Sequence, residues 1–137
     1  MADDAMPEPS PALEAAQTHC ADVLSADCPS RVVLRHVTSQ WGVLLLLVLM
    51  ERMHRFSELR RKVGGVSEKM LAQTLKWLEA DGFVDRVSLP VVPPHVEYSL
   101  TPLGHKVAKR VGALANWIEE SLPEIMEAQQ TRASSRG

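Results

Sequence analysis

The sequence has few aromatic residues, few cysteines and no long apolar run. Phe, Trp and Tyr make up only 4% of the 137 residues, so we expect an aliphatic core built on Leu and Val. The apolar run at residues 43–50 is too short to span a bilayer. The first residues are acidic and Pro-rich and lack the regions of a signal peptide, so we expect a cytoplasmic protein that does not contact the membrane. Its two cysteines are then expected to be thiols.

The sequence also lacks the motifs of metal sites and of catalysis. Its five histidines do not fall into a ligand pattern such as HExxH, and its two cysteines form no CxxC pair. It contains no glycine-rich phosphate loop and no Ser/His/Asp constellation. We therefore expect no metal, no cofactor and no enzymatic activity.

The charge of the chain is unevenly distributed, although the total is only −2. Residues 1–28 contain six acidic residues and no Lys or Arg, which gives −6. Residues 29–118 contain thirteen Lys or Arg against seven Asp or Glu, which gives +6, and residues 119–137 have a charge of −2. A basic segment between acidic ends favours contact with a phosphate-bearing partner.

Residues 55–81 have the pattern of a helix-turn-helix: a short helix, a turn containing Gly64 and Gly65, and a longer helix. Ser67 is a suitable N-cap for the longer helix, because its hydroxyl can accept a hydrogen bond from a backbone N–H of the first turn. Gly82 follows that helix and can adopt the positive φ that commonly ends one.

The longer helix has two different faces at 3.6 residues per turn. One face is expected to pack on the domain and contains Leu71, Thr74, Leu75 and Leu78. The opposite face contains Lys69, Gln73, Lys76 and Ala80. Gln can pair with adenine, and Lys can reach guanine or phosphate, so this face suits the major groove of DNA. An ordinary solvated helix face is an equally good interpretation of these four residues alone.

After Gly82 the pattern changes from helical to alternating, which predicts strands over residues 83–89 and 95–100. Residues 90–94 contain three prolines, so they are expected to form a stiff extended loop between two antiparallel strands. A helix-turn-helix that leads directly into a two-stranded hairpin is a winged helix.

Helices are also predicted on both sides of this unit. Residues 31–38 are expected to form a short helix, and a central buried helix is expected from Trp41 to about Arg52. Thr101 is expected to cap a long helix that runs to about Ser121. Its apolar face comprises Leu103, Val107, Val111, Leu114 and Ile118. This face is larger than a small winged domain needs to cover, so we expect the helix to mediate dimerisation.

The chain is accordingly divided into three parts. Residues 1–27 form an acidic N-terminal arm that is expected to be partly disordered, with a short helix over residues 13–24. Residues 28–122 form the winged-helix domain with its long dimerisation helix. Residues 123–137 are expected to form a further helical segment, because Pro123 either breaks the helix or begins another turn, and a disordered tail over residues 131–137.

The order of motifs in the chain is similar to that of a known family. The motifs are Cys28-Pro29, Trp41 with its Leu-rich run, RFSELRR at residues 55–61, Val66-Ser67, Gly82-Phe83-Val84, Val92-Pro93-Pro94, and VEYSLT at residues 96–101. With these motifs the chain resembles the HxlR-type winged-helix transcriptional regulators of bacteria over roughly residues 28–120. Where many members have a turn containing Gly before RFSELRR, this chain has Met53-His54.

The resemblance implies a mainly helical α+β fold: a winged helix-turn-helix with a two-stranded β wing and extra terminal helices for dimerisation. It implies a homodimer that binds a pseudo-palindromic operator in double-stranded DNA and regulates nearby genes, with repression as the expected direction. The residues expected to contact DNA from the helix-turn-helix are Arg55, Ser57, Arg60, Arg61, Ser67, Lys69, Gln73 and Lys76.

The wing is expected to bring Arg86, His95 and Pro94 towards an adjacent minor groove. Arg86 has an alternative use, because it could instead form an ion pair with Asp85 or Glu97 on the hairpin.

Cys28 is the candidate for sensing an oxidant. It precedes a predicted helix start, where a thiolate is stabilised, and some members of the family use a cysteine at this position to detect oxidants or electrophiles. The alternative is a small apolar residue that packs under the N-terminal helix.

One other function competes with that of a DNA-binding regulator, and a second is compatible with it. The winged helix could be a protein–protein interaction module that does not bind specific DNA, with the hairpin and the long helix holding the partner. It could also respond to a small molecule bound between the central and the long helix, which would add regulation to DNA binding.

Overall fold

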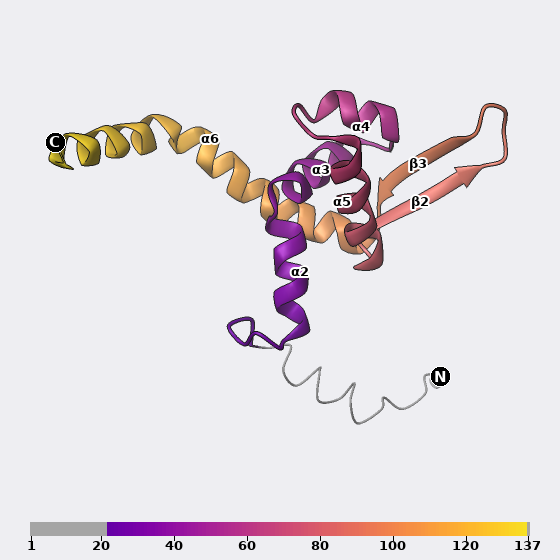
Figure 1. The fold of residues 1–137 in the computed structure, drawn as a ribbon, viewed down its shortest axis with the longest axis horizontal. Helices are drawn as coiled ribbons and strands as arrows, with labels where there is room; N and C mark the ends of the chain where they lie inside the picture. The colour runs from indigo at the N-terminus through magenta and orange to yellow at the C-terminus, as the bar shows by residue number, and fades with distance from the viewer. Residues whose placement is uncertain (1–21, 137) are drawn as a thin grey trace.

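The computed structural model describes residues 22–136, in which the helices pack together and a two-stranded hairpin projects from them (Figure 1). The elements in chain order are α2 (Pro29–Thr38), α3 (Gln40–Glu51), β1 (His54–Arg55), α4 (Phe56–Lys62), α5 (Glu68–Ala80), β2 (Val84–Leu89), β3 (His95–Leu100) and α6 (Pro102–Arg136). This architecture confirms the predicted winged helix-turn-helix. The helix predicted over residues 13–24 lies outside the described residues up to residue 21, and residues 23–27 form turns and a bend.

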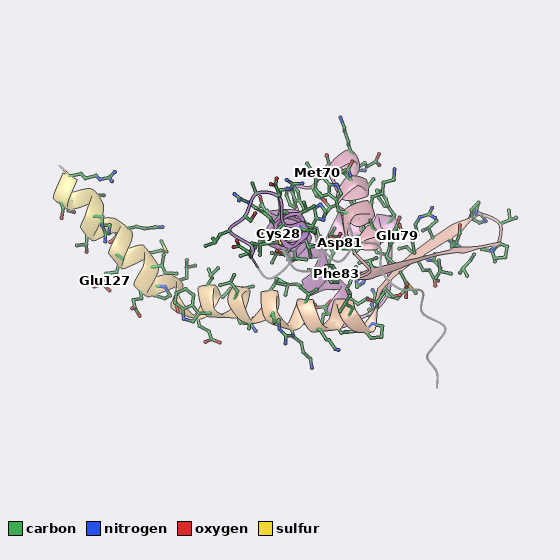
Figure 2. The ribbon with its side chains drawn as sticks, turned by 90° about the horizontal axis from the view of Figure 1, so that it is seen from below. Cys28, Met70, Glu79, Asp81, Phe83 and Glu127 are labelled. Atoms are coloured by element: carbon green, nitrogen blue, oxygen red, sulfur yellow. The ribbon has the colours of Figure 1, made fainter. Side chains whose placement is uncertain are left out.

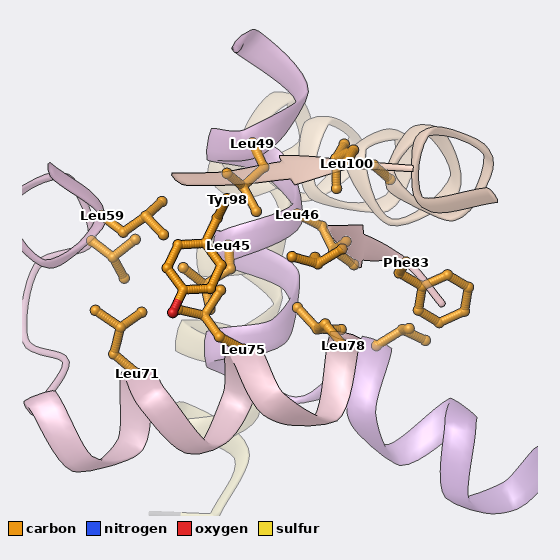
Figure 3. Packing of buried hydrophobic residues seen from close by; sticks show 14 of the residues in the cluster. Leu45, Leu46, Leu49, Leu59, Leu71, Leu75, Leu78, Phe83, Tyr98 and Leu100 are labelled. Atoms are coloured by element: carbon orange, nitrogen blue, oxygen red, sulfur yellow. The ribbon is translucent and has the colours of Figure 1, made fainter. Parts of the chain in front are cut away.

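Helix α3 lies at the centre of the domain and packs on α6, α5 and β3. Leu45, Leu46 and Leu49 of α3 are buried against leucines of α5 and against Tyr98 and Leu100 of β3 (Figure 3). Each fully buried Leu side chain contributes about 1.5–3 kcal/mol from the removal of its apolar surface from water. The expected aliphatic core and the central position of this helix are therefore confirmed.

Helix α5 has the caps and the inward face that the sequence predicts. The Ser67 hydroxyl accepts a hydrogen bond from the Met70 backbone N–H at 3.1 Å, and Gly82 ends the helix with φ of +85°. The buried residues of α5 are Leu71, Thr74, Leu75 and Leu78. The opposite face is left exposed towards the solvent, beside the hairpin.

The sheet has one strand more than predicted. Strands β2 and β3 form the wing in a register that pairs Val84 with Leu100 and Leu89 with His95. Of the two residues expected in a turn, Met53 and His54, the second is instead the start of β1 and pairs with Tyr98 of β3. A two-residue strand has no periodicity of its own, and its pairing depends on a strand far away in the chain. The sequence pattern therefore could not reveal it.

Helix α6 is longer than predicted. The Gly104 N–H donates to the Thr101 hydroxyl at 2.9 Å, which confirms the expected N-cap. The helix does not end near Ser121: it continues through Pro123 to Arg136, so the tail expected to be disordered is helical up to that residue. Proline removes one hydrogen bond and bends a helix, and Figure 1 shows that α6 is not straight. The division of the chain at residue 122 thus falls inside one helix.

Gly104 allows α6 to lie directly against the start of the wing. A Cβ added at Gly104 would overlap the carbonyl oxygen of Phe83 and lie 2.9 Å from its carbonyl carbon, and both are backbone atoms. We expect Gly104→Ala to lower the free energy of unfolding by about 1–3 kcal/mol, because the helix must move away from Phe83. Urea unfolding should show a lower midpoint with an unchanged slope.

Gly64→Ala is the matched control for that substitution, because a Cβ at Gly64 would meet nothing within 4 Å. Its φ is not positive, so alanine fits the backbone without strain. The control should be neutral or slightly stabilising. Equal midpoints for the two variants would show that the close approach of α6 to Phe83 is not required.

Candidate nucleic-acid interface

The exposed face of α5 and the base of the wing enclose a shallow hollow of about 500 Å³, which we call the α5–wing hollow. Its lining residues are Lys69, Ala72, Gln73, Leu75, Lys76 and Glu79 of α5 with Arg86 of β2 and Tyr98 of β3. Four of the residues predicted to contact DNA, three on α5 and one on the wing, therefore line a single surface. All four are exposed.

The chemistry of the α5–wing hollow suits the edges of bases. The Gln73 amide can both donate and accept hydrogen bonds, and Lys69 and Lys76 supply ammonium donors. These groups match the acceptors and donors that a base pair presents in the major groove, where a helix of this diameter fits. Arg86 adds a guanidinium that can contact a phosphate or a base.

Glu79 lines the same hollow and was not predicted to contact DNA. The predicted outer face had no carboxylate, but Glu79 lies three residues after Lys76 and is exposed (labelled in Figure 2). A carboxylate can accept a hydrogen bond from the amino group of cytosine, and it repels phosphate. In the sequence, Glu79 follows Lys76 by three residues, about one helical turn, and this spacing already indicated that the two side chains are neighbours.

Helix α4 forms a second basic surface next to the first turn of α5. Ser57, Arg60 and Arg61 line a hollow of about 330 Å³ together with Phe56 and Glu68. A guanidinium nitrogen of Arg60 lies 2.7 Å from a Glu68 carboxylate oxygen, so this cation is partly neutralised. Such an exposed pair is worth at most about 1 kcal/mol and can open when a phosphate approaches.

Arg55 and Ser67 occupy the residues that precede α4 and α5, respectively. The Arg55 backbone N–H donates to the Glu58 carboxylate at 2.9 Å, which holds the pKa of Glu58 below its usual value. The Arg55 side chain is exposed. Ser67 uses one lone pair of its hydroxyl to cap α5, and its O–H remains a donor for a phosphate.

His95 is the last of the predicted residues, and the hairpin places it apart from Arg86. Among residues 22–136, Arg86 has no carboxylate within ion-pair distance, so the alternative in which it pairs with Asp85 or Glu97 is not seen. Arg86 pairs with Tyr98 across the hairpin, whereas His95 pairs with Leu89, about 10 Å further along β2. His95 is therefore placed towards the wing tip and does not line the α5–wing hollow.

Cys28 is buried, with only 1% of its surface exposed. It occupies the N-cap position of α2 (labelled in Figure 2). Its sulfur lies 2.8 Å from the Ser30 hydroxyl oxygen. A helix N-terminus favours thiolate, whereas burial slows attack by an oxidant. The burial agrees with the packing alternative in this conformation, and the sensing role stays a prediction.

Neither a metal site nor a membrane-spanning helix is found within the described part of the chain. No group of three or more His, Cys, Asp or Glu side chains comes together there in a way that could hold a metal ion. No single helix in the same residues is long and apolar enough to cross a membrane; α2 and α3 meet that criterion only as a pair, bent by 69° at their junction.

Comparisons with known proteins find a family and relatives that share this helix-turn-helix. The family model described as HxlR-like helix-turn-helix matches residues 36–126. The chain is 62% identical over 113 residues to an uncharacterised HTH-type transcriptional regulator, YtfH, of Escherichia coli K12, covering 82% of this chain and 90% of that protein.

Two solved structures are similar to the chain. The putative transcriptional regulator ytfH from Salmonella typhimurium is 62% identical, with a TM-score of 0.77, over 80% of this chain and 97% of that one. The redox regulator HypR in its oxidised form is 35% identical, with a TM-score of 0.63, over 68% of this chain and 96% of that one.

Proposed function

The chain belongs to the HxlR-like helix-turn-helix family of transcriptional regulators, and we propose that it binds a specific operator in double-stranded DNA as a homodimer. The observation that carries this proposal is the α5–wing hollow, in which Lys69, Gln73, Lys76 and Arg86 lie together. Helix α5 would enter the major groove, and Arg86 would approach the adjacent backbone or minor groove. Arg55, Ser57, Arg60, Arg61 and Ser67 would hold phosphates beside it.

The exposed apolar side of α6 supports a dimer. The first half of α6 packs on α3 through Val111 and Gly112, and the apolar stripe continues beyond the domain. Its exposed members are Leu103, Leu114, Trp117, Ile118, Leu122 and Met126. Figure 2 shows the end of α6 extending away from the other elements, and all of these side chains except Leu103 lie in the part of the helix that leads towards this end. A second copy would cover them.

A symmetric dimer would place two copies of α5 on two half-sites about 34–36 Å apart, one turn of DNA, so the operator would be pseudo-palindromic. An operator that overlaps a promoter would be occupied at the expense of RNA polymerase. Repression is therefore the direction that we propose.

Regulation by a thiol oxidant is a second element of the proposal, and the similarity to the redox regulator HypR supports it. Cys28 would be the sensing residue, because it occupies the N-cap position of α2. We expect Cys28→Ser to remove any response of DNA binding to a thiol oxidant such as diamide. The change in operator affinity on oxidant treatment, measured by fluorescence anisotropy, tests this.

Cys20→Ser is the matched control, because Cys20 is the other cysteine of the chain. It should keep the full response of the native protein to the oxidant. If Cys28→Ser responds as the native protein does, Cys28 has a packing role. The oxidant would then act through another residue of the chain.

The alternative function is a protein–protein interaction module in which the hairpin and α6 hold a partner and the basic surface is incidental. Both functions use the same fold, and they differ in whether the exposed face of α5 recognises a sequence. Lys69, Gln73 and Lys76 favour DNA, because their side chains complement base edges and phosphates.

The deciding experiment measures binding to the intergenic DNA upstream of the chain's own gene, against random duplex, at about 50 and 200 mM salt. Specific sites are typically bound about 10³-fold or more tightly than random DNA at matched salt. Such a difference is the expected result. Equal and steeply salt-dependent binding to both duplexes would leave only a basic surface, and no binding would favour the protein-partner alternative.

A further inference from the structure

A buried histidine connects α2 to the last turn of α5. His36 of α2 has 7% of its surface exposed, and its Nδ1 lies 2.6 Å from Oδ2 of Asp81. The same imidazole stacks on the ring of Trp77, with ring centroids 5.0 Å apart and planes 9° from parallel. An ionised carboxylate can only accept hydrogen bonds, so the protonated nitrogen is Nδ1, and it donates a hydrogen bond to Asp81.

The backbone of His36 is held rigidly at the corner between α2 and α3. The Ser39 hydroxyl donates to the His36 carbonyl oxygen at 2.9 Å and accepts from the Gly42 N–H at 3.1 Å. A Cβ at Gly42 would overlap that carbonyl oxygen, so the two helices are in backbone contact there. His36 therefore extends from a fixed corner.

On the other side, Asp81 and Trp77 belong to the C-terminal end of α5. Asp81 is the C-cap residue: its backbone N–H donates to the Trp77 carbonyl at 3.0 Å, and the Gly82 N–H donates to the Glu79 carbonyl at 3.0 Å. The next residue, Gly82, accepts a hydrogen bond from the Thr101 hydroxyl at 2.6 Å, at the start of α6. The end of α5 is thus attached at two points, to α2 through His36 and to α6 through Thr101.

A small rotation at this end is amplified at the other end of α5. Lys69 lies twelve residues before Asp81, about 18 Å along the helix axis. A tilt of about 5° at Asp81 would therefore move Lys69 sideways by about 1.6 Å, which is enough to break a hydrogen bond to a base edge.

We propose that His36 is a positioning residue for DNA recognition, which through Asp81 and Trp77 sets the angle of α5 relative to α2 and α3. This inference rests on the proposed function. His36 itself lies on the inner side of α5 and does not line the α5–wing hollow, so it acts on DNA only through the pose of the helix.

The test compares the ratio of operator affinity to random-duplex affinity, at matched salt, in the native protein and in variants. His36→Ala and Asp81→Ala should each lower this ratio about tenfold, because each removes the same hydrogen bond to a charged group. The double variant should lose little more than either single variant, since the two residues act as one unit. His36→Asn should recover most of the ratio, because its amide can replace the Nδ1–H donor.

His105→Ala is the matched control, because His105 is exposed on α6 and does not line the α5–wing hollow. Thermal unfolding of each variant separates folding from recognition, since a purely structural role would lower the unfolding temperature and leave the ratio unchanged. If His36→Ala does not fold, Asp81→Ala and His36→Asn provide the comparison.

An unchanged ratio in the folded single variants would overturn the proposal, and so would losses that simply add in the double variant. A native protein without operator preference would overturn the proposed function together with this inference. The native measurement alone identifies that case, so the two failures are distinguishable.

Discussion

The double substitution Lys69→Ala and Gln73→Ala is expected to abolish operator preference and leave the dimer intact. Each good base contact contributes about 1–3 kcal/mol of discrimination, and two side chains in each of two half-sites lose their contacts together. The ratio of operator affinity to random-duplex affinity should therefore fall from about 10³ or more to near one. Folding should be unaffected, because both side chains are exposed.

The control replaces two other cations with alanine, Lys106 and Lys109. Both residues are exposed on α6 and do not line the α5–wing hollow. This variant should keep the operator preference of the native protein. Competition titrations of the same labelled operator give the ratio for all three proteins, and sedimentation gives their oligomeric state. If the Lys69/Gln73 variant retained sequence preference, the placement of α5 in the major groove would be refuted.

The predictions that succeeded rest on local signals. Ser67 and Gly82 mark the ends of α5 through their own backbone chemistry, and the spacing of Leu71, Leu75 and Leu78 defines its buried face. Because the buried face was correct, the exposed face was correct too, and with it three of the six α5 residues that line the α5–wing hollow, Lys69, Gln73 and Lys76.

The features that the sequence did not reveal depend on contacts between distant residues. His36 and Asp81 are 45 positions apart, and β1 exists only through its pairing with β3. A histidine on an apolar helix gives no indication of its partner before the helices are packed. The local pattern likewise placed a helix end near Pro123, whereas the residues on both sides of the proline continue the helix.

The second large effect is expected on α6. We expect Leu114→Glu with Ile118→Glu to convert the proposed dimer into monomers, because both side chains lie on the exposed apolar stripe and a dimer would desolvate the introduced carboxylates. The domain itself should remain folded, since Leu114 is 56% exposed and packs little on α3. Sedimentation velocity and circular dichroism measure the two outcomes.

Loss of the dimer would also remove the gain from binding two half-sites at once. Linked binding modules bind about 10²–10⁴-fold more tightly than single ones, so operator affinity should fall by a factor in this range while the contacts in each half-site remain.

Asn116→Glu is the matched control, because Asn116 is exposed and lies on the side of α6 opposite to Leu114 and Ile118. It also introduces a carboxylate into the exposed part of the helix, and it should leave both dimer and affinity unchanged. A Leu114/Ile118 variant that stays dimeric would show that another surface holds the two copies, and the exposed stripe of α6 would then be available to a different partner.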